Sequence, residues 1–137
     1  MLTFIDTNIL VYAYDADAGD KHLKAQAVLR DCWENESGAI STQVLQEFYV
    51  TVTHKLTKTV SAQTARKVIE TYRAWPIYCP TIEDIIAASE LGEKHQLSFW
   101  DALIVISAQL SRATTLLSED LQHTQHIGSL RIINPFK

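Results

Sequence analysis

The chain has 137 residues, of which 47% are hydrophobic, and its 12 Lys and Arg against 16 Asp and Glu give a formal charge of −4. This length is typical of one domain, which we place at residues 1–137, and it allows burial of roughly two thirds of the unfolded surface. No apolar run approaches the roughly 20 residues that cross a bilayer and no signal peptide opens the chain, so we expect a cytoplasmic protein without membrane contact.

The N-terminal part predicts a strand, a polar turn and a helix in close succession. The apolar residues 2–5 predict a short buried strand, and Asp-Thr-Asn at residues 6–8 leads into a helix that starts with residues 9–14. An irregular apolar stripe predicts a second helix at residues 21–36. Residues 38–41 predict the second strand.

The middle of the chain supplies a helix, another helix and a third strand. Ser41 or Thr42 caps a helix through residues 43–56, whose apolar side chains share one side. Residues 61–75 predict the next helix and residues 76–79 the third strand. Two cysteines, one before and one within this part, are too few for a disulfide framework, and we expect both Cys32 and Cys79 to be reduced core thiols.

Two capping signals open the helices of the C-terminal part. Thr81 with Asp84 makes a capping box for residues 82–96, and Ser98 with Asp101 opens a strongly apolar helix. The remaining elements are a strand, a polar turn and a last strand, at residues 114–118, 119–123 and 130–134. Strands separated by helices predict an α/β fold with a mostly parallel central sheet and helices on both faces.

Four acidic residues fall where such a sheet binds ligands. Asp6, Glu47 and Asp120 follow the carboxyl ends of strands, and Asp101 in the first turn of its helix can face the same crevice. Taken singly, Asp6 is typical of an N-cap, Glu47 of a solvated helix residue and Asp120 of a turn residue. For Asp101 the alternative is a cap that returns a bond to the backbone N–H of Ser98. Together the crowded carboxylates would repel without cations, and oxygen ligands suit Mg²⁺ or Mn²⁺.

These segments carry a resemblance to a known family. FIDTN, the Glu in TQVLQEFY, SFWDALIV and LLSEDLQH resemble the four acidic blocks of PIN-domain ribonucleases, most closely the VapC-like toxins of bacterial toxin–antitoxin pairs. Their order, spacing and context agree over nearly the full chain. The resemblance implies a PIN-like three-layer α/β/α sandwich that acts as a metal-dependent endoribonuclease, with Mg²⁺ as the cofactor and Mn²⁺ as an alternative.

The resemblance also implies roles for single residues. Asp6 and Asp101 would be the main metal ligands, and Asp120 and Glu47 would complete the catalytic cluster directly or through water. The residues expected to orient them are Thr7, Asn8 and Ser118. Glu119 is a second acidic candidate for the ion beside Asp120, and we favour Asp120 because neighbours in an extended segment point apart.

Substrate contacts have to come from outside this cluster. Basic side chains on the predicted helices are candidates for phosphate contact: Lys21, Lys24, Lys55, Lys58, Arg66, Lys67 and Arg73. Trp100 or Tyr14 could stack on a base, although we expect Trp100 in the core. The net charge of −4 does not exclude RNA, because bound cations would reverse the local sign of an acidic pocket.

The resemblance implies three partners: an RNA substrate, a cognate antitoxin protein that blocks the cleft, and a second copy in a homodimer. Other functions stay open at this point. They are a PIN-like nuclease with a housekeeping RNA-processing or DNA role, and a non-catalytic module whose acids bind a basic partner. A phosphatase of the haloacid-dehalogenase kind would need a second Asp where the chain has Asn8.

Overall fold

The computed structural model describes residues 1–137 and contains one sheet of six strands. The strand order is β3-β2-β1-β4-β6-β5, and every neighbouring pair is parallel except the antiparallel pair β5 and β6. The strands are β1 (Leu2–Ile5), β2 (Gly38–Ser41), β3 (Ile77–Tyr78), β4 (Ala113–Leu117), β5 (His126–Ile127) and β6 (Leu130–Ile133). The predicted α/β class with a mostly parallel central sheet is therefore confirmed.

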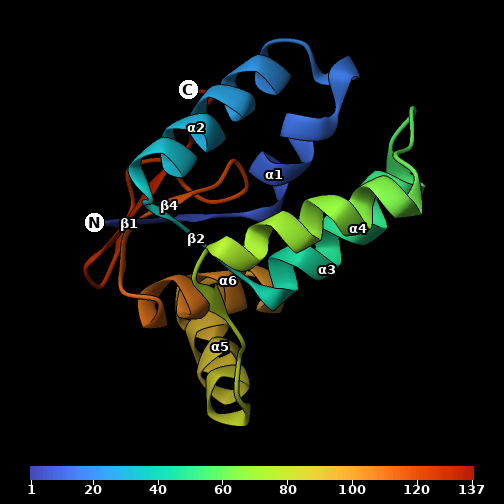
Figure 1. The fold of residues 1–137 in the computed structure, drawn as a ribbon. Helices are drawn as coiled ribbons and strands as arrows, with labels where there is room; N and C mark the ends of the chain where they lie inside the picture. The colour runs from blue at the N-terminus through green and yellow to red at the C-terminus, as the bar shows by residue number, and fades with distance from the viewer.

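Six α-helices surround this sheet. They are α1 (Thr7–Tyr14), α2 (Asp20–Asn35), α3 (Thr42–Val50), α4 (Ala62–Thr71), α5 (Ile82–His95) and α6 (Phe99–Leu110). Figure 1 shows α1 and α2 on one side of the sheet and α5 and α6 on the other, which gives the expected three layers. The antiparallel pair α3 and α4 extends beyond the carboxyl end of β1, where α1 begins. No helix is both long enough and apolar enough to cross a membrane.

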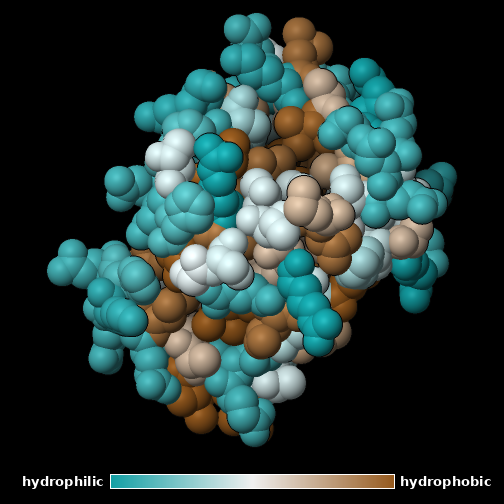
Figure 2. All heavy atoms as spheres, turned by 90° about the vertical axis from the view of Figure 1, so that its left-hand side faces the viewer, coloured by the Kyte–Doolittle hydropathy of each residue, from teal (hydrophilic) through white to brown (hydrophobic).

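The core forms where the central strands meet the helices. Fully buried side chains come from each central strand: Phe4, Ile40, Leu116 and Ile132. At the start of β2 the chain needs a glycine, because a Cβ on Gly38 would lie 2.4 Å from an indole carbon of Trp75. The end of the molecule where β1 and β2 both start is a mosaic of hydrophilic and hydrophobic side chains (Figure 2).

The helix starts agree with the predicted caps. Ser41, and not Thr42, caps α3, since its hydroxyl accepts a backbone N–H of the first turn. Thr81 and Asp84 form both bonds of a capping box at α5. The expected helix at residues 43–56 is α-helical only to Val50 and continues as a single π-helical turn, η2 (Thr51–Lys55).

The structure corrects three expectations. The strand β5 was missed, because two residues show no alternation of apolar and polar side chains. Cys79 is exposed, so only Cys32 is the buried thiol that was expected of both. Trp100 is 59% exposed and is not a core residue. The strand β5 is too short to be predicted, and Cys79 and Trp100 stand in apolar sequence, so their exposure depends on their position in the fold.

Candidate active site

The site begins where β1 and β4 end side by side. Ile5 and Leu117 are paired in the parallel register, so the next residues, Asp6 and Ser118, leave the sheet together. The hydroxyl of Ser118 donates to Asp6 Oδ2 at 2.7 Å, and both side chains are buried. The predicted meeting of polar residues at the carboxyl edge of the sheet is thus present.

Asp6 is the most deeply buried carboxylate in this group, with 4% of its surface exposed. It caps α1 by accepting the backbone N–H of Thr7 at 2.7 Å. Burial raises the pKa of Asp6 to about 7; the hydrogen bonds from Ser118 and Thr7 oppose this rise, and the charges of Asp120 and Asp101 add to it. The side chain is both a cap and a buried acid that lacks a compensating positive charge.

Glu47 is turned inward from α3. The hydroxyl of Thr7 donates to Glu47 Oε1 at 2.6 Å, and the amide of Gln43, one turn earlier on the helix, lies 3.3 Å from Oε2. Because α3 starts directly after β2, its first turns stand at the same edge of the sheet as Asp6. Glu47 is therefore held by neighbours in the site and is not a freely solvated helix residue.

Asp101 lies in the first turn of α6. Its backbone N–H donates to the hydroxyl of Ser98 at 3.1 Å, but its carboxylate returns no bond to the Ser98 backbone. The capping alternative for the Asp101 carboxylate is therefore absent from the structure. Burial raises the pKa of Asp101; a hydrogen bond with Ser98 opposes the rise, and the charges of Asp120 and Glu47 add to it.

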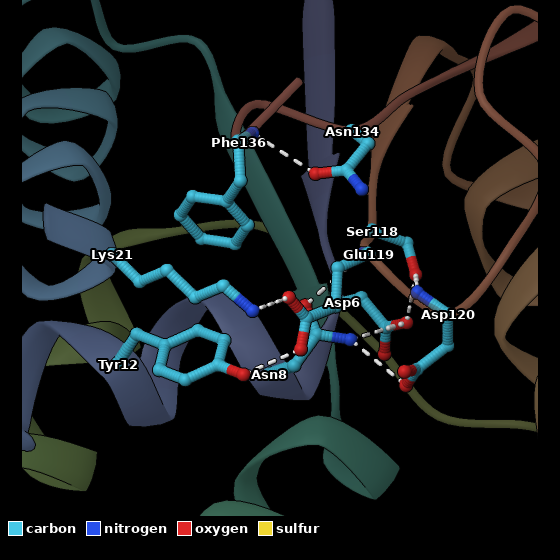
Figure 3. A network of polar contacts seen from close by, with 9 residues as sticks. All are labelled: Asp6, Asn8, Tyr12, Lys21, Ser118, Glu119, Asp120, Asn134 and Phe136. Atoms are coloured by element: carbon cyan, nitrogen blue, oxygen red, sulfur yellow. Dashed lines mark hydrogen bonds and ion pairs between the residues drawn. The ribbon is translucent and has the colours of Figure 1, made fainter. Parts of the chain in front are cut away.

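Asn8 joins two of the acids. Its Nδ2 donates to Asp120 Oδ2 at 3.0 Å and lies 3.4 Å from Asp6 Oδ2. The backbone N–H of Asp120 donates to the Ser118 hydroxyl at 3.1 Å, so the same hydroxyl that binds Asp6 also fixes the segment after β4. Figure 3 shows Asn8 between Asp6 and Asp120. Asn8 and Ser118, two of the residues expected to orient the acids, therefore each contact a carboxylate of this group.

Glu119 faces away from Asp120. Its carboxylate accepts hydrogen bonds from the hydroxyl of Tyr12 and from Lys21 Nζ, the latter at 2.8 Å (Figure 3). Burial alone would raise the pKa of Glu119, but the bonds from Lys21 and Tyr12 outweigh it and leave that pKa below its usual value. Of the two adjacent acids, Asp120 is the one turned toward Asn8 and Asp6.

A cleft of about 620 Å³ is lined by two of the four acids, Glu47 and Asp120, whereas Asp6 and Asp101 are not among its lining residues. Side chains from α1, α3, η2 and α6 line it, among them Val11, Gln43, Glu47, Val50, Lys55, Leu56, Trp100 and Asp120. Trp100, an exposed residue in the first turn of α6, is thus part of the cleft wall. The cleft combines an acidic edge with an apolar wall, which suits a ligand that carries both phosphate and a flat ring.

The acids have no basic partner within the protein. The ion pairs of the chain join Lys21 to Glu119 and Arg73 to Glu70, so none involves Asp6, Glu47, Asp101 or Asp120. The buried Oε1 of Gln43 also lacks a hydrogen-bond donor. No three of these side chains converge tightly enough to hold a metal ion by themselves. A hydrated Mg²⁺ fits this arrangement, because it binds through one or two carboxylates and keeps several waters that can donate to nearby acceptors.

Sequence reasoning missed three side chains of the site. Gln43 could have been found, since it stands one helical turn before Glu47 on the same face. Tyr12 and Lys21 carry no such signal, because Glu119 is about a hundred residues away in sequence. Lys21 had been expected as a phosphate contact, and the structure instead pairs it with Glu119.

The chain is similar in fold to several solved proteins. The toxin–antitoxin complex from Klebsiella pneumoniae has a TM-score of 0.67 at 20% identity, covering 97% of each chain. FitAB bound to an IR36 DNA fragment has a TM-score of 0.71 at 17% identity, covering 99% of this chain and 96% of that one. VapC20 from Mycobacterium tuberculosis, described as a Sarcin-Ricin loop cleaving toxin, has a TM-score of 0.64 at 18% identity, covering 83% and 86%.

Sequence comparison gives the family directly. No curated protein sequence matches the chain. The family model of the PIN domain, however, matches residues 3–126, a span that contains all four acids and the residues that orient them. The chain belongs to the PIN domain family.

Proposed function

We propose that this protein is a Mg²⁺- or Mn²⁺-dependent endoribonuclease and the toxin of a toxin–antitoxin pair. The observation that carries the proposal is the buried Asp6 carboxylate, which lies near the acids Asp120 and Asp101 and lacks any basic partner. The similarity of fold to a toxin–antitoxin complex and to a toxin that cleaves the sarcin–ricin loop supports the toxin assignment.

In the proposed site, Asp6 and Asp101 hold the ion, and Asp120 and Glu47 complete its surroundings directly or through water. A bound divalent ion lowers the pKa of its water and neutralises charge on the scissile phosphate. Ser118 keeps the Asp6 carboxylate in place through the 2.7 Å bond to Oδ2. The protein thereby supplies a fixed set of oxygen ligands at the edge of the sheet.

Glu47 is the candidate proton acceptor. Thr7 occupies Oε1 with a hydrogen bond of 2.6 Å, and Oε2 has only the long contact from Gln43 at 3.3 Å. Oε2 is thus able to take a proton from the attacking water. The water oxygen would then bond to phosphorus while the bond to the 3′-oxygen of the neighbouring nucleotide breaks; that oxygen takes a proton from solvent, so the products carry a 5′-phosphate and a 3′-hydroxyl.

The cleft supports single-stranded RNA as the substrate. Trp100 precedes Asp101 in the chain, lines the cleft and exposes 59% of its surface. An unpaired base can stack on such an indole, and Lys55 in the same cleft can contact a phosphate. The bases of a duplex would be inaccessible to Trp100, so an unpaired segment fits the cleft better.

We also assign partners within this proposal. A cognate antitoxin would place Arg or Lys side chains among the carboxylates, which have no basic partner in the chain itself. The exposed apolar side chains Ile82, Ile85 and Ile86 on α5 are available for homodimer contact. The protein would act in the cytoplasm, where its RNA substrate lies.

An RNA cleavage assay tests this function. The wild-type chain should cut single-stranded RNA with Mg²⁺ or Mn²⁺, leave 5′-phosphate ends, and lose activity in EDTA. Asp6→Asn should be inactive, and Asp31→Asn, which removes an exposed charge on α2, should cut like the wild type. Cleavage that persists in EDTA, or an active Asp6→Asn chain, would contradict the proposal. Parallel DNA substrates separate a ribonuclease from a nuclease with a DNA role.

A further inference from the structure

Glu119 sits in a small basic and aromatic enclosure of its own. Lys21 Nζ lies 2.8 Å from Glu119 Oε2, and the hydroxyl of Tyr12 donates to Oε1. The Lys21 ammonium is also 5.2 Å from the ring centre of Tyr12 and 5.6 Å from that of Phe136. Figure 3 shows this group on the far side of Glu119 from Asp120. The enclosure therefore draws the Glu119 carboxylate away from the acidic cluster.

The enclosure is built from three separate parts of the chain. Tyr12 belongs to α1 and Lys21 to α2, while Phe136 lies near the C-terminus. The rings of Tyr12 and Phe136 meet edge to face with centres 5.3 Å apart, and the backbone N–H of Phe136 donates to Asn134 Oδ1 at 2.9 Å. These contacts restrict Tyr12, so its hydroxyl is already directed when it meets Glu119.

The neighbouring residue has the opposite orientation. Asp120 accepts a bond from Asn8 at 3.0 Å and donates its backbone N–H to Ser118 at 3.1 Å, while the Glu119 N–H lies 3.4 Å from Asn8 Oδ1. Glu119 and Asp120 lie in the bend after β4, and their side chains are held on opposite sides, Glu119 by Tyr12 and Lys21 and Asp120 by Asn8 (Figure 3), so holding Glu119 outward favours the inward position of Asp120. The segment after β4 has two acids and only one of them can face the cluster.

We propose that Lys21 and Tyr12 are positioning residues, which hold Glu119 outside the cluster and thereby keep Asp120 turned inward to complete the ion site. The inference rests on the proposed metal-dependent function and adds to it the device that selects between two adjacent acids. An ion pair with one solvent-exposed partner contributes little to fold stability, so its effect should appear in metal binding. Lys21 has 45% of its side-chain surface exposed, which fits a small contribution to fold stability.

Mn²⁺ binding to the purified chain, followed by electron paramagnetic resonance, tests the inference without RNA. Lys21→Met should weaken Mn²⁺ binding by about tenfold, as is usual when a group that orients a ligand is lost. Tyr12→Phe should weaken it less, because the ring beside Lys21 remains. Arg30→Met removes one exposed charge from the same helix and should bind Mn²⁺ like the wild type. Thermal unfolding should be nearly unchanged in all three.

A double variant shows whether Lys21 acts through Glu119. Lys21→Met combined with Glu119→Gln should bind Mn²⁺ no more weakly than Lys21→Met alone, because both changes break one interaction. Wild-type affinity in both Lys21→Met and Tyr12→Phe, or losses that simply add in the double variant, would overturn the inference. A lower unfolding temperature with unchanged affinity would also overturn it, since that is the result of a purely structural pair.

The outcomes for the two proposals differ. A wild-type chain that binds Mn²⁺ and responds to Lys21→Met, yet leaves RNA intact, would refute the ribonuclease and leave the positioning role standing. A chain that cuts RNA with Mg²⁺, but whose metal affinity ignores Lys21 and Tyr12, would refute only the positioning role. A chain that binds no Mn²⁺ at all would remove both.

Discussion

The first turns of α5 and α6 carry the same local pattern, a hydroxyl residue followed three positions later by Asp, but the two carboxylates differ. At α5, the Tyr78 hydroxyl and the backbone N–H of Thr81 both donate to Asp84, and these bonds lower its pKa. At α6, the Asp101 carboxylate returns no such bond, and burial raises its pKa. The same sequence pattern thus produces Asp84, whose carboxylate accepts the capping bond, and Asp101, whose carboxylate does not.

The difference teaches how a cap can be told from a ligand. The Asp84 carboxylate accepts hydrogen bonds from groups of the protein, so the fold stabilises its charge. Asp101 is placed near Asp120 and Glu47, whose charges oppose its own, and no basic side chain relieves them. A bound cation would stabilise the charge of such an acid, and the protein supplies none.

The largest expected effect distinguishes Asp101 from Asp84 by the rate of RNA cleavage. Asp101→Asn should lower RNA cleavage by at least about a hundredfold, because a ligand charge is lost, while the chain stays folded. The measurement is the initial rate of RNA cleavage in Mg²⁺ beside a circular dichroism spectrum. The matched change Asp84→Asn should leave the cleavage rate near that of wild type. Equal losses in both variants would erase the distinction between them.

Asp6 gives the next largest effect, on stability against pH. Its folded pKa is about 7 against an ordinary 3.8, so the stability from its protonated form is complete below about pH 4 and is lost as the pH rises through 7. The loss is on the order of 4 kcal/mol in metal-free protein. Urea unfolding in EDTA between pH 4.5 and 7.5 measures it, and Asp6→Asn should remove this pH dependence. A wild-type curve that rises over this range would contradict the assignment.

A smaller effect is expected at the exposed residue beside Asp101. Trp100→Ala should raise the KM for single-stranded RNA about tenfold with little change in kcat, because one base–indole stack is lost. Since 59% of Trp100 is exposed, its removal should cost little stability. Steady-state cleavage of a short RNA measures both constants. A fall in kcat with constant KM would mean that Trp100 positions Asp101 and does not contact substrate.

The smallest effect is expected at Asp84. Asp84→Asn should lower the free energy of unfolding by about 1 kcal/mol at pH 7, since the capping bond to Thr81 weakens. The pKa of Asp84 is lowered, so the stability that it contributes is present above its ordinary pKa and is lost as the pH falls through its folded value. Its pH dependence therefore has the opposite sign to that of Asp6. Urea unfolding of both variants at pH 7 and pH 3 compares them.

Local signals account for what the sequence predicted correctly. The strand at residues 2–5 and the capping box of Thr81 and Asp84 depend on neighbours in the chain, and both are present as expected. The parallel topology placed Asp6 and Asp120 at the same edge of the sheet, and Ser118 was expected there from the family resemblance. The bond between Asp6 and Ser118 could not be predicted, because it requires the register of β1 and β4.

The features that could not be predicted from the sequence depend on residues distant in the chain or on exposure to solvent. Trp100 stands in an apolar segment and was expected in the core, yet its place in the first turn of α6 puts it at the cleft. The orientation of Glu119 depends on Lys21, which no local pattern connects to it. The exposure of Cys79 likewise depends on where β3 ends at the edge of the sheet.

The pairing of β1 with β4 has a consequence for synthesis of the protein. Ser118, which binds Asp6, and Asp120, which binds Asn8, are each made 112 residues after their partners. Under the proposed function, a nascent or prematurely terminated product lacks the competent centre. The ribosome that makes the enzyme is thereby spared from its activity until β4 and the residues after it have been made.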